Sequence, residues 1–377
     1  MGLLYCTCVG FKNALVAIKS RPADKMRIAF SRFSFTRLYR SFHLINNFGS
    51  KKHYISNIGI LFLLCYFSTH IFAQEKRYSF EKGLMGSPFK IIIYADNDSI
   101  ANKAAQGAFK RIEDLNASLS DYRDDSEINA VSAQSGTDQW IPVSKDLFDI
   151  LYISDDISKK TNGAFDATLG PIVQEWRRAT RKGYFPDSAL IKNALSKTGY
   201  QKIKFDASTQ SIQLPVKGMR LDIGGLGKGY AADEAVKVLK SYGIKSAMID
   251  AGGKLALMDP PPGEKGWKIV ISSGRDSIET IEYSNVGMAT SGPTYRYLDY
   301  KGKRYSHIVD PKTGIGLLYH VRTTVISPTS VEADALATAF SVSGIKEGKK
   351  YIRRFPNNKV WLVETKNGKV KTWNTIK

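Results

Sequence analysis

The chain has 377 residues, with 55 Lys and Arg against 35 Asp and Glu, and a formal net charge of +20. This length is enough to bury a core in one or two domains, and 24% charged with 11% aromatic residues excludes a wholly disordered chain. The charge is uneven, because residues 1–73 carry ten basic residues and one acid, whereas residues 74–377 carry 45 basic and 34 acidic residues. All three cysteines also precede residue 74, which excludes thiol chemistry and a disulfide framework from the rest of the chain.

Residues 51–73 have the pattern of a secretory signal peptide. Lys51 and Lys52 precede a mostly apolar run, Ile58 to Phe67, and the small residue Ala73 precedes a polar stretch. The run is too short for a bilayer, which needs about 20 residues. We expect cleavage and export to the periplasm or the outer face of the cytoplasmic membrane, with an uncleaved membrane anchor as the alternative. Residues 1–50 are interpreted as a basic extension outside the mature protein, and a translation start further downstream is the favoured explanation.

Residues 74–377 are expected to form one domain with elements of both kinds. A strand over 89–95 leads to a helix capped at Asp98 and Ser99, with apolar residues at helical spacing as far as Leu119. Further helices are expected at 145–161, 229–242 and 330–343, and strands at 202–205, 211–214, 246–250, 254–258, 267–272, 305–309 and 322–327. Hairpins and helices in this order favour an α+β fold, with mixed sheets and packed helices, over regular βαβ winding.

A glycine-rich segment precedes the second of these helices. It has four glycines in six residues, from Gly224 to Gly229. Glycine lets backbone N–H groups approach a phosphate, and a helix N-terminus favours an anion. The spacing fits neither a Walker A loop nor G-x-G-x-x-G. A phosphate-binding loop and a tight strand-to-helix turn both remain possible interpretations.

Asp334 and Thr338 are four residues apart in the predicted helix at 330–343, which starts with Thr329 and Glu332 at capping-box spacing. Their oxygens therefore project from one helix face. The rest of that face is small or apolar, and an unpaired carboxylate there would be very costly. A hard cation such as Mg²⁺, held by one carboxylate and substrate phosphates, is one solution. A buried hydrogen bond or salt bridge of Asp334 is the other.

His307 lies in a predicted strand that ends at a D-P-K-T-G turn. Only His307 and His320 follow residue 73, which excludes a His-rich zinc site. With no cysteine and no G-x-S-x-G motif there, serine and cysteine hydrolases also lose support. Alone, His307 is either a structural residue or a catalyst.

Three earlier segments mix aromatic, acidic and glycine residues: 84–89, 119–129 and 163–176. In the second, Tyr122 with Arg123 is a candidate to cover a planar ring. In the third, Phe165 with Asp166 is a candidate to close a pocket. Each segment, taken singly, is also compatible with an ordinary turn.

Seven segments taken in order resemble the ApbE family of FAD:protein FMN transferases. They are M-G-S-P-F, S-D-Y-R-x-D-S-E-I-N, G-A-F-D-A-T-L-G-P, L-D-I-G-G-L-G-K-G-Y-A-A-D, A-T-S-G, H-I-V-D-P-K-T-G and T-V-I-S-P-T-S-V-E-A-D-A-L-A-T-A, and they run from Met85 to beyond Gly344. Seven ordered motifs are highly specific. The resemblance implies a T-fold-like ApbE architecture of the α+β class, FAD as donor substrate, and Mg²⁺ at the FAD diphosphate.

The resemblance also implies site residues. The family's metal ligands correspond to Asp334, Thr338 and the carbonyl of Gly225, with the carbonyl of Ala337 as a further candidate. The FAD contacts correspond to Met85, Tyr122, Phe165, Asp166, Ala167, Asp222, Lys228 and Val309. The catalytic residues are expected to be His307, as the base, with Asp334 and Lys228. Lys254 stands where the family often has Asn or Asp after an A-G-G turn, which leaves the contact made from this position open.

The implied reaction is an attack by a Ser or Thr hydroxyl of an acceptor flavoprotein on the FMN-side phosphorus of FAD, with release of AMP. His307 would take the hydroxyl proton, while Mg²⁺ and Lys228 would offset charge on the diphosphate. Two alternatives stay open. One is a Mg²⁺-dependent FAD diphosphohydrolase giving FMN and AMP, and the other is a non-catalytic flavin-binding envelope protein.

Nucleic acid is not an expected partner. The basic residues of 74–377 are interspersed with 34 acids, and no recognition motif is present. Contact with a membrane is expected only through the acceptor protein or an uncleaved leader.

Overall fold

The computed structural model describes residues 75–272, 278–292, 297–318, 320–366 and 368–376. The predicted basic extension and signal peptide lie outside the described residues. Within these ranges, no helix combines the length and the apolar character needed to cross a membrane.

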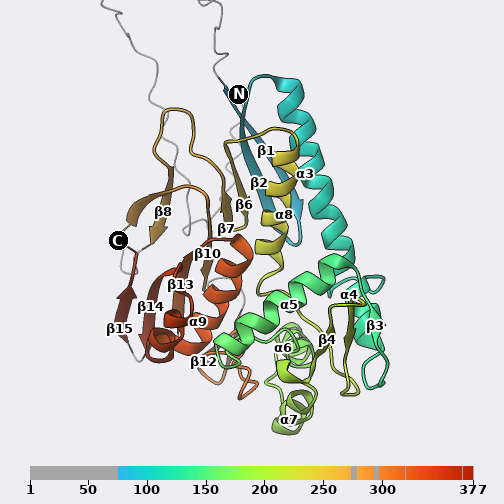
Figure 1. Cartoon of the computed structure of the whole chain (residues 1–377). Helices are drawn as coiled ribbons and strands as arrows, with labels where there is room; N and C mark the ends of the chain where they lie inside the picture. The colour runs from blue at the N-terminus through green and yellow to red at the C-terminus, as the bar shows by residue number, and fades with distance from the viewer. Residues whose placement is uncertain (1–74, 273–277, 293–296, 319, 367, 377) are drawn as a thin grey trace, which may run out of the picture. The chain divides into compact units, whose positions relative to one another are not determined.

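The centre of the fold is a sheet of eight strands in the order β1-β2-β6-β7-β10-β13-β14-β15 (Figure 1). The strands are β1 (Lys76–Leu84), β2 (Ser87–Ala95), β6 (Ala247–Ala251), β7 (Lys254–Leu257), β10 (Val286–Ser291), β13 (His320–Ser327), β14 (Lys359–Lys366) and β15 (Lys369–Asn374). Each neighbouring pair runs antiparallel. An antiparallel sheet with helices confirms the α+β prediction.

Both faces of this sheet are covered, and β2 shows why its sequence is so apolar. Ile91, Ile92 and Ile93 are all fully buried. Because successive side chains of a strand point to opposite faces, Ile91 and Ile93 join the core under the helices, while Ile92 joins a second core on the other face. A hairpin of β8 (Trp267–Ser272) and β9 (Ile278–Tyr283) covers that second core.

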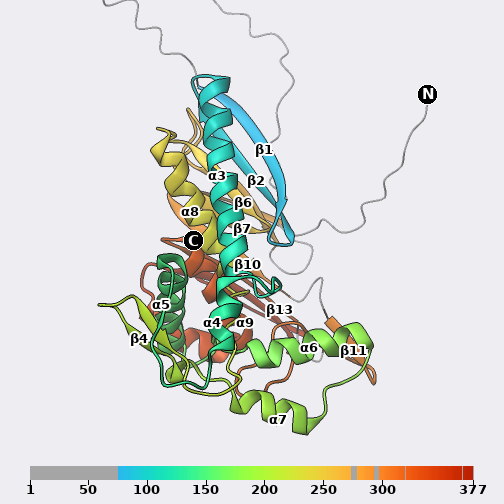
Figure 2. The same ribbon diagram turned by 90° about the vertical axis from the view of Figure 1, so that its right-hand side faces the viewer.

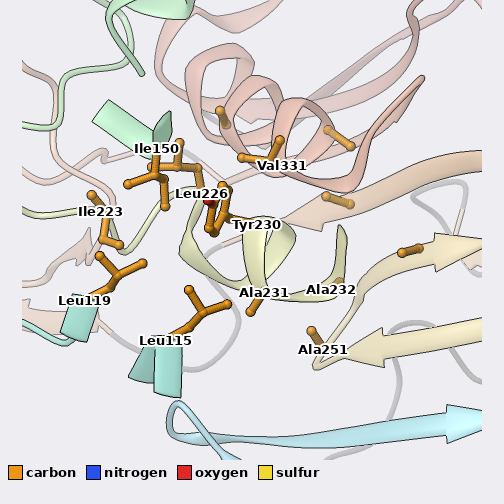
Figure 3. Close-up of a cluster of buried hydrophobic side chains, with 14 of the residues drawn as sticks. Leu115, Leu119, Ile150, Ile223, Leu226, Tyr230, Ala231, Ala232, Ala251 and Val331 are labelled. Atoms are coloured by element: carbon orange, nitrogen blue, oxygen red, sulfur yellow. The ribbon is translucent and has the colours of Figure 1, made fainter. Parts of the chain in front are cut away.

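Three helices cover the other face of the sheet: α3 (Asp98–Leu119), α8 (Gly227–Ser241) and α9 (Ser330–Tyr351). Figure 2 shows α3 running beside α8 and the strands β1 and β2. In Figure 3, Leu226 and Tyr230 at the start of α8 lie between Val331 of α9 and Leu115 and Leu119 of α3. The start of α8 is therefore packed between two other helices.

Two helix boundaries agree with the sequence and one does not. Thr329 is the N-cap of α9 and accepts a hydrogen bond from the Glu332 N–H at 3.4 Å, as its spacing predicted. The first part of α9 ends at Gly344, whose φ of 63° breaks the helix. The predicted cap at Asp98 and Ser99 is wrong, because the extended Asn97 accepts the Ile100 N–H instead.

A smaller group of elements lies beyond the end of α3. Its helices are α4 (Glu127–Ala133), α5 (Lys145–Lys160), α6 (Gly170–Lys182) and α7 (Ser188–Ser196). A three-stranded sheet contains β3 (Ile141–Pro142), β5 (Ser211–Gln213) and β4 (Lys204–Asp206), and β11 (Tyr297–Tyr300) pairs with β12 (Lys303–Ser306). Short 3₁₀ turns occupy Tyr200–Lys202 and Ile352–Arg354.

Two predicted strands begin or end elsewhere. Residues 200–202 form a 3₁₀ turn, so the strand predicted at 202–205 begins only at Lys204. The strand predicted at 305–309 ends at Ser306, whose hydroxyl accepts the Ile308 N–H at 3.0 Å and turns the chain. His307 therefore follows β12 and is not part of it.

Candidate functional site

The start of α8 and the first turns of α9 touch backbone to backbone. A Cβ atom on Gly229 would lie 2.3 Å from the carbonyl oxygen of Ser330, so only glycine fits at this crossing. The Gly229 N–H donates to Oδ2 of Asp334 at 3.1 Å, and Asp334 is 1% exposed. The glycine thus lets α8 reach the buried carboxylate of α9.

The three principal predicted metal ligands meet at this crossing. Oγ1 of Thr338 lies 3.4 Å from the carbonyl oxygen of Gly225 and 3.2 Å from the backbone carbonyl of Asp334. Gly225 is also pressed against Phe165, because a Cβ atom there would lie 2.8 Å from the ring. The carbonyl of Ala337, the fourth candidate, accepts the Ser341 hydroxyl at 2.8 Å inside α9.

This donor set is chemically suited to Mg²⁺. It offers a carboxylate, a hydroxyl and a carbonyl, all of them oxygen ligands, and Mg²⁺ is commonly held by one or two carboxylates together with substrate phosphates. In the described ranges there is no group of three or more His, Cys, Asp or Glu side chains arranged to hold a metal ion. A site with a single carboxylate therefore fits Mg²⁺ completed by a phosphate ligand better than a metal held by the protein alone.

Lys254 contacts the same carboxylate from the sheet. It is the first residue of β7, its side chain is 12% exposed, and its Nζ lies 3.6 Å from Oδ1 of Asp334. The ammonium also donates to the carbonyl of Thr290 on β10 at 2.7 Å. The structure thus contains the salt bridge that the sequence left as one of two alternatives for Asp334, and the metal stays a prediction.

The glycine-rich segment itself is a tight turn. The Gly224 N–H donates to Oδ1 of Asp222 at 2.7 Å, and the N–H groups of Leu226 and Gly227 donate to the Ile223 carbonyl at 3.0 and 2.8 Å. These amides are used within the chain, which favours the turn over a cradle of amides for a phosphate. The group that this segment contributes to the contact between α8 and α9 is the backbone carbonyl of Gly225.

A buried ion-pair group lies beside this turn. Arg177 of α6 pairs with Asp121 and, at 3.2 Å, with Asp222. Burial and the neighbouring Asp121 raise the pKa of the Asp222 carboxyl above its ordinary value, while the attraction of Arg177 and Lys228 opposes that shift. Lys228 is therefore close enough to act on the charge of Asp222.

Arg177 also supports Tyr122. Its guanidinium carbon lies 4.1 Å from the centre of the Tyr122 ring, a cation–π geometry. The ring is 64% exposed and presents aromatic surface to solvent. The sequence analysis predicted that Tyr122 would act with Arg123. In the structure, Arg123 forms an ion pair with Asp125 at 2.7 Å. Arg177 was not identified from the sequence because α6 was not predicted. Its two acidic partners, Asp121 and Asp222, both lie in segments that the sequence analysis singled out.

The third early segment is tied to the glycine-rich turn. Asp166 accepts the Thr168 N–H at 2.7 Å and the Tyr200 N–H at 3.0 Å, and burial raises the pKa of its carboxyl. The Ala167 carbonyl accepts the Asp222 N–H at 2.7 Å. Asp166 thus positions its own loop, and with it the buried Phe165. Contact of these residues with FAD stays a prediction.

Met85 reaches the same turn from the β1–β2 hairpin. It has a positive φ of 49°, and its Cε would lie 3.8 Å from a Cβ atom on Gly227.

The D-P-K-T-G loop is anchored to α6. Nε1 of Trp176 donates to the Gly314 carbonyl at 2.7 Å, and Val309 packs in one cluster with Trp176 and Ile172. His307 is exposed between the buried residues Ser306 and Ile308. Helix α6 therefore connects this loop, through Trp176, with Tyr122 and Asp222, through Arg177. The role of His307 stays a prediction.

Comparisons with known proteins agree with these observations. The family model described as "ApbE family" matches residues 85–362. A protein named "FAD:protein FMN transferase" from Klebsiella pneumoniae (strain 342) is 30% identical over 285 residues, which cover 75% of this chain and 87% of the relative. One of the same name from Treponema pallidum (strain Nichols) is 28% identical over 303 residues, covering 75% and 83%.

A solved structure supports the fold as well. The crystal structure of Pseudomonas stutzeri flavinyl transferase ApbE, in its apo form, superposes with a TM-score of 0.71 at 26% identity. It covers 80% of this chain and 95% of that one. The predicted architecture is therefore confirmed.

Proposed function

The chain belongs to the ApbE family, and we propose that it transfers FMN from FAD to a partner protein, the activity that gives its curated relatives their name. The observation that carries this proposal is the meeting of Asp334, Thr338 and the Gly225 carbonyl at the α8–α9 crossing. These oxygens lie beside Phe165 and next to a turn that holds Asp222 and Lys228. A metal-dependent reaction at a diphosphate uses this combination of groups.

The proposed reaction is a transfer of the FMN phosphoryl group from FAD to a hydroxyl of the acceptor protein. The acceptor's Ser or Thr hydroxyl oxygen forms a bond to the FMN-side phosphorus, the bond from that phosphorus to the bridging oxygen breaks, and AMP leaves. The hydroxyl proton passes to the imidazole of His307, an exposed residue that an incoming protein can reach. The product is FMN in phosphoester linkage to the partner.

The chain's own residues divide the remaining work. Tyr122, backed by Arg177, offers exposed aromatic surface to the flavin. The buried Phe165 is a further predicted contact, together with Met85, Asp166, Ala167 and Val309. Lys228 supplies positive charge to the diphosphate. Mg²⁺ held by Asp334, Thr338 and Gly225 supplies a Lewis acid for the phosphate oxygens. Fixed charges of this kind are usually a large catalytic contribution.

The direct test is incubation with FAD, Mg²⁺ and a candidate acceptor domain, followed by a denaturing gel. A fluorescent flavin–protein adduct supports the proposal, and mass spectrometry of the adduct identifies whether a Ser or Thr carries it. FMN and AMP without an adduct would replace the transferase with a diphosphohydrolase. Bound FAD without turnover would leave a flavin-binding protein.

Two variants test the assigned roles. Asp334→Ala is expected to abolish AMP release while retaining some FAD binding, and full activity of this variant, or of the wild type with excess chelator, refutes the metal assignment. His307→Ala is expected to lower turnover far more than FAD affinity. An unchanged rate returns His307 to a structural role.

Export of the chain is also proposed, on the pattern of residues 51–73. N-terminal sequencing of the protein recovered from the cell envelope tests it. A mature end near residue 74 supports cleavage of the leader, whereas a retained apolar segment supports a membrane anchor.

A further inference from the structure

Lys254 places a fixed positive charge inside the candidate metal site. Its ammonium is nearly buried, lies 3.6 Å from Oδ1 of Asp334, and is held by the Thr290 carbonyl at 2.7 Å. Oδ2 of the same carboxylate accepts the Gly229 N–H at 3.1 Å. Both oxygens of Asp334 therefore face a positive or hydrogen-bond-donating group that belongs to the protein.

This arrangement changes how a divalent cation can bind. A buried carboxylate without a partner would favour metal capture strongly, because its charge is costly to leave uncompensated. Here Lys254 already offsets the charge of Asp334, and it also attracts the neighbouring carboxyl of Asp250. A divalent cation entering beside the ammonium meets a like charge a few ångströms away, and such repulsion is substantial near a protein surface or interior.

We infer that Lys254 makes metal binding depend on the substrate's diphosphate. The ammonium weakens binding of a divalent cation to the empty site, and a diphosphate supplies the negative charge that lets both cations be present together. Lys254 is in this sense a positioning residue that acts on the metal through Asp334. The inference rests on the proposed function, because it takes the Asp334 site to be the metal site.

The test measures metal binding directly and does not depend on FMN transfer. Mn²⁺ binding to the full chain is followed by electron paramagnetic resonance, with and without ADP as a diphosphate that resembles half of FAD. The wild type is expected to bind Mn²⁺ weakly alone and at least about tenfold more tightly with ADP. Lys254→Met is expected to bind Mn²⁺ alone at least about tenfold more tightly than the wild type, a difference of about 1.4 kcal/mol, and to gain less from ADP.

Two further variants make the result specific. Lys254→Gln removes the charge and keeps a donor for the Thr290 carbonyl, so it separates the effect of charge from a loss of packing. Lys90→Met is the matched control, since Lys90 acts electrostatically on Asp250, lies on β2 two strands away from β7, and has no ion pair with Asp334 in the part of the chain described. Lys254→Gln should follow Lys254→Met, and Lys90→Met should follow the wild type.

The Mn²⁺ measurements distinguish failure of the inference from failure of the metal assignment. Equal Mn²⁺ affinity of the wild type and both Lys254 variants, with binding still observed, overturns the inference and leaves the proposed function in place. No Mn²⁺ binding by any variant, with or without ADP, overturns the inference together with the metal assignment. Tighter binding by the Lys254 variants alone supports the inference even where no acceptor has been found.

Discussion

Replacing Arg177 by Met removes a guanidinium that pairs with two buried acids at once. The side chains of Asp121 and Asp222 are 11% and 9% exposed, so neither carboxylate regains much water when its partner is lost. Removing one member of a buried ion pair costs about 3–5 kcal/mol. Because the Arg177 side chain is itself 28% exposed, we expect a loss of about 3 kcal/mol in the free energy of unfolding at pH 8.

The loss should depend on pH with a definite sign. Burial already raises the pKa of Asp222, and without Arg177 this pKa rises further. A carboxyl whose pKa is higher in the folded state than in the unfolded state favours folding when protonated and opposes it as the pH rises through the folded pKa. The difference between wild type and Arg177→Met is therefore expected to be smaller at pH 5 than at pH 8.

Urea unfolding at both pH values measures the effect, and Arg181→Met is a matched control. Arg181 lies in the last turn of the same helix and is exposed, and substitutions at such surface positions usually change stability by less than about 0.5 kcal/mol. Equal losses in the two variants, or a difference that does not change between pH 5 and pH 8, would refute the reasoning. Titration with FAD under the same conditions is expected to show weaker binding, because the Tyr122 ring loses its support.

Two other predictions concern the contact between α8 and α9. Gly229→Ala places a Cβ atom 2.3 Å from the Ser330 carbonyl oxygen, so we expect thermal unfolding to show a loss of about 3 kcal/mol in the free energy of unfolding. Gly107→Ala is the control, because its Cβ atom meets only side-chain atoms, and it should change this free energy by less than about 1 kcal/mol. Asp233 accepts the N–H groups of Ser330 and Val331, and burial raises the pKa of its carboxyl to about 6. Wild-type stability should therefore fall relative to Asp233→Asn by up to about 3 kcal/mol between pH 4 and pH 7, and parallel urea-unfolding profiles would contradict this.

Much of the central fold was predictable because its signals are local. The run of isoleucines in β2 indicates a strand buried on both faces. Thr329 marks the start of α9 and Gly344 the end of its first part, through a cap and a positive φ. Such features depend on residues within one or two turns of each other, and the sequence contains them directly.

Helix α6 was not predicted, although its sequence contains the local signals of a helix. Ile172, Trp176 and Ala179 are buried at i, i+4 and i+7, with a proline in the first turn and a left-handed glycine at the end. The sequence does not show the partners of the helix, which come from distant segments and include Gly314 and two acids that lie 56 and 45 residues from Arg177. Tertiary contacts of this kind leave no periodic pattern in the chain.

The same limit applies to the candidate site. The motifs indicated Asp334, Thr338 and Gly225 through the family resemblance, and the structure places Thr338 against the Gly225 carbonyl, while their role as metal ligands stays a prediction. The motifs did not predict the contact between Lys254 and Asp334. Lys254 departs from the family pattern, and it reaches Asp334 because β7 lies under α9. The contact of a residue outside the pattern had to come from the structure.

Arg177 and Lys254 have a common electrostatic consequence. Each brings a fixed positive charge to buried acids before any ligand is present, Arg177 at Asp121 and Asp222, and Lys254 at Asp334. A divalent cation alone would add positive charge beside Lys254, and a diphosphate alone would add negative charge beside buried carboxylates. Each ligand offsets the charge that the other introduces, so binding of either should strengthen binding of the other by the same factor. The two effects are equal by linkage whatever their cause, so the result that these charges require is that both effects are reduced in Lys254→Met.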